Sequence, residues 1–335
     1  MARRARRSDY GYAGGRVHAL ETRLIDRARF QRMVDAPTAA EAFRVLAETD
    51  YAGSIAEVKD VSQFEAVLAR ELDRVYDLLA ELAPDEFLKL VFAYKFDIHN
   101  LKVLLKARSL GQDYSYLLVS RGTVPPLELA EAVQAGEGLP PHFAAAVSAA
   151  ADAFAATEDP QLIDTILDGA LYELLAKEAR RRRYRMIIEW VQASIDLANI
   201  RTFLRVRRLG KDSSFLAQAL LNGGLIPPAR FQELFAQPVE ALAAGLADTP
   251  YSRIAAEGAR LAKDMAPLAG LEKLADDYLT GIAKGARFIP LGPESLFAYI
   301  LAKENEIRNV RIILAGKLND VAAETIRERL RDVDV

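Results

Sequence analysis

The stretch Asp97-Ile98-His99-Asn100-Leu101-Lys102 decides the fold of this 335-residue chain, because it occurs three times. Its second copy is Asp196-Leu197-Ala198-Asn199-Ile200-Arg201, and its third is Glu306-Ile307-Arg308-Asn309-Val310-Arg311. In each copy an acid, an aliphatic residue, any residue, Asn, an aliphatic residue and a base follow in that order. Such self-similarity at long spacing indicates one supersecondary unit repeated along the chain. We call this pattern the signature.

Further recurrences surround the signature. Two segments begin alike, and a third resembles them more faintly: Leu24-Ile25-Asp26-Arg27-Ala28-Arg29-Phe30-Gln31, Leu225-Ile226-Pro227-Pro228-Ala229-Arg230-Phe231-Gln232 and Gly122-Thr123-Val124-Pro125-Pro126. Leu46-Ala47-Glu48-Thr49-Asp50-Tyr51 likewise resembles Leu246-Ala247-Asp248-Thr249-Pro250-Tyr251. Gly111 and Gly210 follow two signature copies at equal distance, where a left-handed glycine commonly ends a helix. These observations predict three helical modules, at residues 1–112, 113–211 and 212–335.

The residue pattern favours an all-α fold. Good helix formers are abundant, and no convincing run of alternating β-branched residues is present. Residues 161–209 contain no proline and one glycine, which predicts one long helix or a closely joined pair. Three such modules suggest a pseudo-threefold body, whose axis would suit a partner.

Composition excludes several classes of protein. The hydrophobic fraction of 51% is ample for a core. The formal net charge of −3 does not indicate any particular class of binding partner. Without cysteine there is no disulfide, thiolate metal site or cysteine nucleophile, which is consistent with a reducing cytoplasm. Residues 143–156, the longest weakly polar stretch, are too few to span a bilayer, so we expect a soluble protein.

The signature helices carry polar residues on their apolar side. At about 100° per residue, the acids fall inside the apolar arc, the asparagines fall on its border, and Arg108, Arg207 and Lys317 fall at its far end. Buried polar groups need partners. Two interpretations stay open: hydrogen bonds between helices, with acids paired to neighbouring bases, or a shared central surface that contacts a partner. The candidate positions are Asp97, Asn100, Lys102, Asp196, Asn199, Arg201, Glu306, Asn309 and Arg311.

The threefold signature, the Tyr10-Gly11-Tyr12 near the start and the repeated segments that lead to Phe30 and Phe231 resemble the C subunit of the prokaryotic V/A-type rotary ATPases. The counterpart in eukaryotic vacuolar enzymes is the d subunit. The resemblance implies a funnel of three helical modules around a central opening, on the cytoplasmic face of the membrane rotor ring. It further implies an adaptor that holds the end of the central shaft, turns with the rotor and transmits torque. The family has no catalytic residues to transfer.

Other classes of function find little support. The histidines His18, His99 and His142 form no HExxH pattern, and no glycine stretch matches a phosphate-binding loop. We therefore predict no catalytic, cofactor or metal site, and no binding of ATP by this chain. The alternatives are a generic helical scaffold or a nucleic-acid-binding repeat, the latter resting on the run Arg180-Arg181-Arg182-Arg183-Tyr184-Arg185. A run of bases along a helix points to all sides, so we expect a solvated surface there. The Arg-rich start, Arg3 to Arg7, is expected to be a solvated tail, with anionic lipid headgroups as one possible neighbour.

Overall fold

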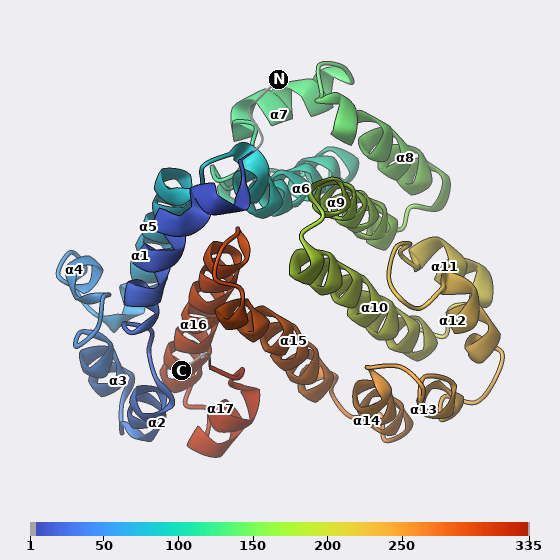
Figure 1. Ribbon diagram of the computed structural model, residues 1–335. Helices are drawn as coiled ribbons and strands as arrows, with labels where there is room; N and C mark the ends of the chain where they lie inside the picture. The colour runs from blue at the N-terminus through green and yellow to red at the C-terminus, as the bar shows by residue number, and fades with distance from the viewer. Residues whose placement is uncertain (1–4, 334–335) are drawn as a thin grey trace. The chain divides into compact units, whose positions relative to one another are not determined.

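The computed structural model describes residues 5–333, and all regular structure within them is helical (Figure 1), which confirms the all-α class. The chain divides into two compact units. Unit 1 combines the chain up to Leu88 with the chain from Pro267 onward, and unit 2 spans Lys89–Ala266. The three modules are defined by the repeat rather than by compactness, and that division stays a prediction.

Unit 1 is built around helix α16, against which α1, α2, α3, α5, α15 and α17 pack. The apolar arc of its signature supplies Ile307, Val310, Ile313 and Leu314 to a core shared with α2, α3 and α5. The helices of this unit are η1 (Arg7–Tyr10), α1 (Gly11–Glu21), α2 (Arg27–Asp35), α3 (Ala39–Leu46), α4 (Ala52–Ile55), η2 (Val61–Gln63), α5 (Phe64–Leu82), α15 (Ala269–Lys284), η4 (Gly285–Phe288), α16 (Glu294–Leu318) and α17 (Ala323–Arg329).

Unit 2 places α10 against α9, α11, α12 and α14. The closely joined pair predicted for residues 161–209 is α9 and α10, which are separated where Arg183 takes the left-handed conformation at φ 60°. The helices are α6 (Glu86–Leu110, whose first residues belong to unit 1), η3 (Ser115–Leu117), α7 (Pro126–Ala135), α8 (Pro141–Thr157), α9 (Pro160–Arg182), α10 (Arg185–Arg208), α11 (Ser213–Ala219), α12 (Pro228–Phe235), α13 (Ala241–Gly245) and α14 (Ser252–Lys263).

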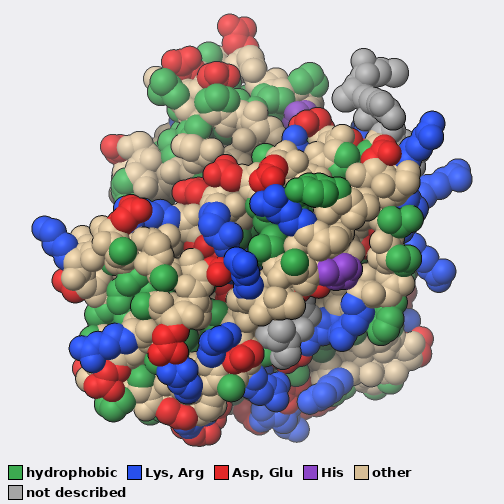
Figure 2. Space-filling model, turned by 60° about the vertical axis from the view of Figure 1, so that its left-hand side comes forward, with side chains coloured by type: hydrophobic (Ala, Val, Ile, Leu, Met, Phe, Trp, Pro, Cys, Tyr) green, Lys and Arg blue, Asp and Glu red, His purple; other side chains and the backbone are tan. Residues whose placement is uncertain are grey.

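The surface mixes both signs of charge. Figure 2 shows acidic and basic side chains interspersed over much of one face, as the small net charge leads one to expect. Among residues 5–333 we find no helix with the length and apolar character needed to cross a bilayer.

The three signature helices end in the same way. Gly111 and Gly210 both have φ 64°, which confirms the left-handed glycine stops, and Asp320 occupies the equivalent place with φ 53°. In each case the next amide donates to a carbonyl five residues back, which satisfies carbonyl groups at the helix end. These bonds join Gln112 to Ala107 (3.1 Å), Lys211 to Val206 (3.2 Å) and Val321 to Gly316 (2.9 Å). The third copy thus keeps the geometry without the glycine.

Replacing Asp320 with Gly should therefore stabilise the protein. A residue with a Cβ is disfavoured in the left-handed region by roughly 1 kcal/mol, and Gly removes this strain. Gly also increases the conformational freedom of the unfolded chain, which cancels part of the gain. We expect the free energy of unfolding, measured in urea, to rise by about 0.5 kcal/mol. Asp320→Ala is the control and should destabilise, because Ala keeps the Cβ and loses the polar group that tolerates this conformation. An unchanged or lower stability of Asp320→Gly would contradict the assignment.

Candidate functional site

Two of the signature acids bind the backbone of a loop that follows their helix. Asp97 accepts hydrogen bonds from the amides of Thr123 (2.9 Å) and Val124 (3.2 Å) and from the Thr123 hydroxyl (2.7 Å). Asp196 accepts from the amides of Leu225 (2.8 Å) and Ile226 (3.0 Å). Both carboxylates are fully buried. Each acid therefore fixes one of the recurrent loop segments onto a signature helix.

The signature asparagines form a second, reciprocal attachment. In every copy the Asn side-chain NH₂ group donates to the backbone carbonyl of one partner residue. The Asn side-chain oxygen accepts from the backbone amide of that same partner, as in a pair of β-strands. Only an Asn or Gln side chain supplies a donor and an acceptor in this arrangement. The pairs are Asn100 with Val119 (2.8 and 2.9 Å), Asn199 with Leu221 (2.9 and 2.8 Å) and Asn309 with Arg331 (3.1 and 2.9 Å).

The bases at the far end of the arc bind carbonyls. Arg108 donates to the Val133 carbonyl (2.7 Å), Arg207 donates to that of Phe235 (2.6 Å), and Lys317 donates to that of Ala36. These carbonyls lie at the C-terminal ends of α7, α12 and α2, where a cation also complements the helix dipole.

The expected pairing of acids with bases is therefore wrong for Asp97 and Asp196, and for Arg108, Arg207 and Lys317. Backbone amides can take the place of a cation as partners of a buried carboxylate. Backbone carbonyls can likewise take the place of an acid as partners of a buried cation. The acids and bases of a copy consequently fasten opposite ends of the same short helix.

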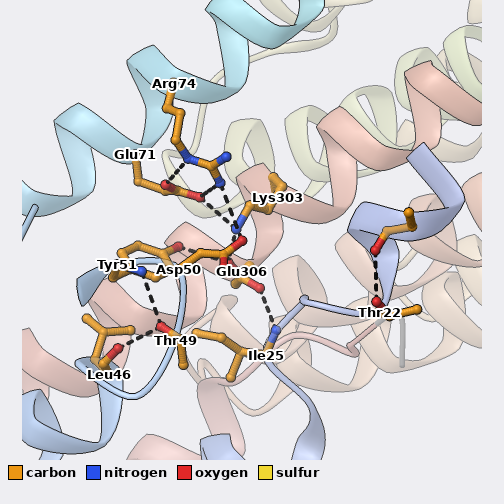
Figure 3. Close-up of polar contacts among 11 residues, drawn as sticks. Thr22, Ile25, Leu46, Thr49, Asp50, Tyr51, Glu71, Arg74, Lys303 and Glu306 are labelled. Atoms are coloured by element: carbon orange, nitrogen blue, oxygen red, sulfur yellow. Dashed lines mark hydrogen bonds and ion pairs between the residues drawn. The ribbon is translucent and has the colours of Figure 1, made fainter. Parts of the chain in front are cut away.

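The attachments around the third signature copy, which we call site 3, come from both ends of the described chain. Figure 3 shows those that the start of the chain supplies. Glu306 accepts hydrogen bonds from the Ile25 amide (2.6 Å) and the Tyr51 hydroxyl (3.0 Å), whereas Asn309 binds Arg331. Ile25 and Tyr51 belong to the recurrent segments whose other copies are Leu225-Ile226 and Leu246–Tyr251, and Tyr251 likewise bonds to Asp196. The start of the chain thus supplies the backbone amide that binds the acid of the third signature. In the other two copies this amide comes from a loop that follows the signature helix.

Site 3 also contains buried ion pairs. Lys303 lies one turn before Glu306, is 1% exposed, and binds the carboxylates of Glu306 (2.6 Å) and Glu71 (2.7 Å). Glu71 of α5 in turn holds Arg74 through two bonds of 2.7 and 2.8 Å. Figure 3 shows these side chains converging between α5 and α16. The network joins the two longest helices of unit 1.

The charges in this network stabilise one another. Burial alone would raise the pKa of Glu71, but the Arg74 hydrogen bonds and the charge of Lys303 together hold that pKa below its usual value. Burial alone would lower the pKa of Lys303, but Glu306 and Glu71 raise it above normal. The pKa of Tyr51 is well above its usual value, first through burial and then through the two acids. In the second signature copy, burial raises the pKa of Asp196 despite its backbone hydrogen bonds.

The signature bases that follow each Asn lie nearer the surface. Lys102 pairs with Asp168 at 2.7 Å and Arg311 pairs with Glu65 at 2.8 Å. Arg201 is half-buried, and within residues 5–333 no hydrogen bond or ion pair holds its guanidinium. These three cations are thus more accessible than the acids and asparagines of the same copies.

Part of the arginine-rich start is anchored, contrary to the expected solvated tail. Arg3 and Arg4 lie outside the described residues. The Ala5 amide donates to Asp85 (3.0 Å), and Arg7 pairs with the buried Glu294 (2.8 Å). These bonds hold the chain against the beginnings of α6 and α16, because buried carboxylates there need donors.

The basic run 180–185 has internal partners. Arg181 pairs with Glu178 (2.8 Å) and Arg180 donates to the Gly223 carbonyl (3.4 Å), whereas Tyr184 is buried. Arg183 ends α9 in the left-handed conformation. Helix geometry and local pairing therefore account for part of this run.

Sequence reasoning did not single out Lys303 or Glu71. Lys303 lies six residues before Asn309, where the other copies have Tyr94 and Ala193, so the repeat itself gave no signal. Its acidic partners are one turn and more than two hundred positions away. The only hint was a lysine within the apolar part of a signature helix.

Comparison with known proteins places these features in a family. The model of the ATP synthase (C/AC39) subunit family matches residues 13–329. The C subunit of the V-type sodium ATPase of Enterococcus hirae is 27% identical over 319 residues, which cover 95% of this chain and 96% of that protein. The C subunits of the A-type ATP synthases of Methanocaldococcus jannaschii and Thermococcus kodakarensis are 26% and 25% identical. Their alignments cover 96% and 97% of this chain, and 86% and 91% of their own lengths.

Proposed function

Because the chain belongs to the ATP synthase (C/AC39) subunit family, we propose that it is a non-catalytic adaptor in the central rotor of a V/A-type ATPase or ATP synthase. It sits on the membrane rotor ring and receives the end of the central shaft. It transmits torque between ATP hydrolysis or synthesis in the soluble head and transport of protons or sodium ions through the membrane part. Its place is the cytoplasmic face of the membrane, held there by the complex.

The observation that carries this proposal is the extent of the family match. The family model covers residues 13–329, and the relatives, all named as C subunits of such enzymes, align over nearly their whole lengths. The match therefore concerns the complete helical repeat and not one exchangeable domain. The resemblance read from the threefold signature and its neighbouring segments points to the same family.

The signature sites support a mechanical role. Their acids and asparagines hold loops and short helices onto the signature helices, and all six side chains are buried. A body fastened in this way deforms little under load, since each buried hydrogen bond is costly to leave unmade. We propose that the three equivalent attachments belong to three modules arranged as a funnel, with the shaft at its opening.

Such an adaptor needs two joints that do not slip, one with the shaft and one with the ring. A durable joint between proteins buries about 2,000 Å² or more. We assign the accessible signature cations Lys102, Arg201 and Arg311 to these joints. The present pairs of Lys102 and Arg311 keep contact with solvent, and such pairs contribute only about 0–1 kcal/mol each to folding.

Reversal of all three charges tests the proposal. In Lys102→Glu/Arg201→Glu/Arg311→Glu we expect a folded protein that recovers roughly ten-fold less shaft and ring on co-purification, with weaker coupling of ATP hydrolysis to ion transport. The control reverses Arg32, Arg230 and Lys263, three cations in exposed pairs outside the signature. It should assemble normally. Normal assembly and coupling of the signature variant would reject the assignment of these residues, and failure of the wild-type chain to bring down shaft and ring would reject the adaptor role itself.

A further inference from the structure

Unit 1 carries an exposed apolar loop beside a group of arginines. Phe288, at the end of η4, is 81% exposed, and Leu291 is 46% exposed. Pro290, between them, is exposed, as is Arg287. Large apolar side chains exposed next to one another commonly mark an interaction site.

The beginning of the chain lies against this loop. Arg7 donates through Nε to the Leu291 carbonyl (3.0 Å), and a Cβ on Gly11 would lie 3.7 Å from the Leu291 side chain. Tyr12, the next residue, is 70% exposed. Arg6 is exposed, as is Arg287, whose guanidinium lies 5.7 Å from the centre of the Phe288 ring. We call Arg6, Tyr12, Arg287, Phe288, Pro290 and Leu291 the basic apolar tip.

The base of the tip is fixed. Gly292 has φ 141°, a conformation that side chains rarely adopt, and a Cβ there would lie 2.2 Å from Glu294 and 2.8 Å from Arg7. The ion pair between Arg7 and the buried Glu294 therefore closes over Gly292. The loop consequently presents Phe288 to solvent from a rigid base.

We propose that the basic apolar tip binds the surface of an anionic phospholipid bilayer. Membrane-surface binding requires two signals, apolar side chains that enter the boundary between headgroups and acyl chains, and cations that pair with anionic headgroups. The tip supplies both within one short segment and its neighbour. Arginine places its aliphatic stem along the apolar layer while its guanidinium stays among phosphates.

A protein partner fits these residues less well. A stable protein interface has a contiguous apolar centre and buries about 800 Å² on each side. The tip offers a few exposed apolar side chains, and Arg6 and Arg287 lie among them. A lipid headgroup layer accepts that mixture, because it offers phosphate and hydrocarbon at adjacent depths.

The test uses the purified full-length chain and lipid vesicles, so it does not depend on the proposed function. The chain should sediment with vesicles of phosphatidylglycerol and phosphatidylcholine at low salt, and less so at high salt or with phosphatidylcholine alone. Phe288→Ser should weaken the partition roughly ten-fold. Arg6→Ala and Arg287→Ala should each weaken it about five-fold.

A matched control separates the tip from exposed apolar surface in general. Leu127→Ser removes a side chain of similar exposure, 72%, in unit 2 and should bind vesicles like the wild type. Thermal unfolding should be unchanged in all these variants, because the replaced side chains are exposed. The proposal is overturned if wild type and anionic vesicles do not co-sediment at low salt, or if Phe288→Ser binds them as wild type does. A Phe288→Ser variant that loses affinity only for the detergent-purified ring would also overturn it and would identify the tip as a protein contact.

Discussion

Replacing Lys303 with Met should lower the free energy of unfolding by about 3–5 kcal/mol. Lys303 is 1% exposed and is the cation shared by Glu71 and Glu306. Met has a similar length but carries no charge, so two carboxylates lose their common partner inside the protein. Removal of one member of a buried ion pair is far more damaging than replacement of the whole pair, because the remaining charge has neither water nor a counter-ion.

Lys102→Met is the matched control. Lys102 pairs with Asp168 at 2.7 Å, the distance of the Lys303–Glu71 pair, but both members of the Lys102 pair keep contact with solvent. Water can replace the lost ion pair there, so the cost should be about 1 kcal/mol or less. The double variant Lys303→Met/Glu306→Gln should be more stable than Lys303→Met alone, since it neutralises the acid that is left without a cation, whereas Glu71 keeps its two bonds to Arg74.

The pH dependence distinguishes lost electrostatics from lost packing. In the wild type the lowered pKa of Glu71 contributes stability that is present above its unfolded pKa and is lost as the pH falls. The raised pKa of Lys303 contributes stability that is present below its unfolded pKa and is lost as the pH rises through its folded pKa. In Lys303→Met, Glu71 keeps Arg74 but loses the charge of Lys303 that helps to lower its pKa, so it should bind a proton more readily when folded. The stability difference from wild type should therefore shrink as the pH falls toward the ordinary carboxyl range.

Urea unfolding followed by circular dichroism measures these changes for the whole chain. The single tryptophan, Trp190, lies on α10 in unit 2, so its fluorescence reports the other unit separately. A loss below about 1 kcal/mol in Lys303→Met, or a difference that does not vary with pH, would show that the network contributes little.

The sequence allowed the location of the buried polar positions to be predicted, but not their partners. The helical wheel placed Asp97, Asp196 and Glu306 in the apolar arc, and all three are buried. A wheel describes one helix and contains no information on which loop returns to it. Pairing of acids with bases was the simplest hypothesis, but two of the acids bind backbone amides instead.

A sequence signal for those partners did exist. The recurrence of Leu24-Ile25 and Leu225-Ile226, with its fainter version at Thr123-Val124, contains the amides that bind the signature acids. Spacing links the first two to their acids, because each loop follows its helix at a similar interval. The third lies 281 positions before Glu306, so only the fold reveals that the chain's start completes the last copy. Lys303 has no counterpart in the repeat, and nothing in one sequence links it to Glu71.

Replacing Gly224 with Ala should cost about 2–4 kcal/mol, although it adds one methyl group to a loop. A Cβ at Gly224 would lie 2.1 Å from Oδ1 of Asp196, and one at Gly122 would lie at the same distance from Oδ1 of Asp97. Two backbone amides hold each carboxylate, so it cannot move aside without leaving those amides unpaired. Overpacking costs about 1–3 kcal/mol, and an unsatisfied buried donor costs a similar amount.

Gly169→Ala makes the same chemical change as Gly224→Ala, but we expect it to increase the stability. Gly169 lies within α9, and a Cβ there would meet the Leu221 side chain at 3.5 Å, an ordinary contact. Since glycine weakens a helix interior, Gly169→Ala should stabilise by about 0.5–1 kcal/mol. Both variants lie in unit 2, so Trp190 fluorescence in urea can follow them.

A double-mutant cycle with Asp196→Ala tests the cause. If the new methyl group acts by displacing the carboxylate, Gly224→Ala should cost much less once Asp196 is absent, because the space is then free. The two losses should therefore combine to less than their sum by about 1 kcal/mol or more, as expected for groups in direct contact. Additive losses would mean that the glycine is needed for the loop's own conformation. In that case the requirement for glycine at this position would not arise from the close approach of the helix and the loop.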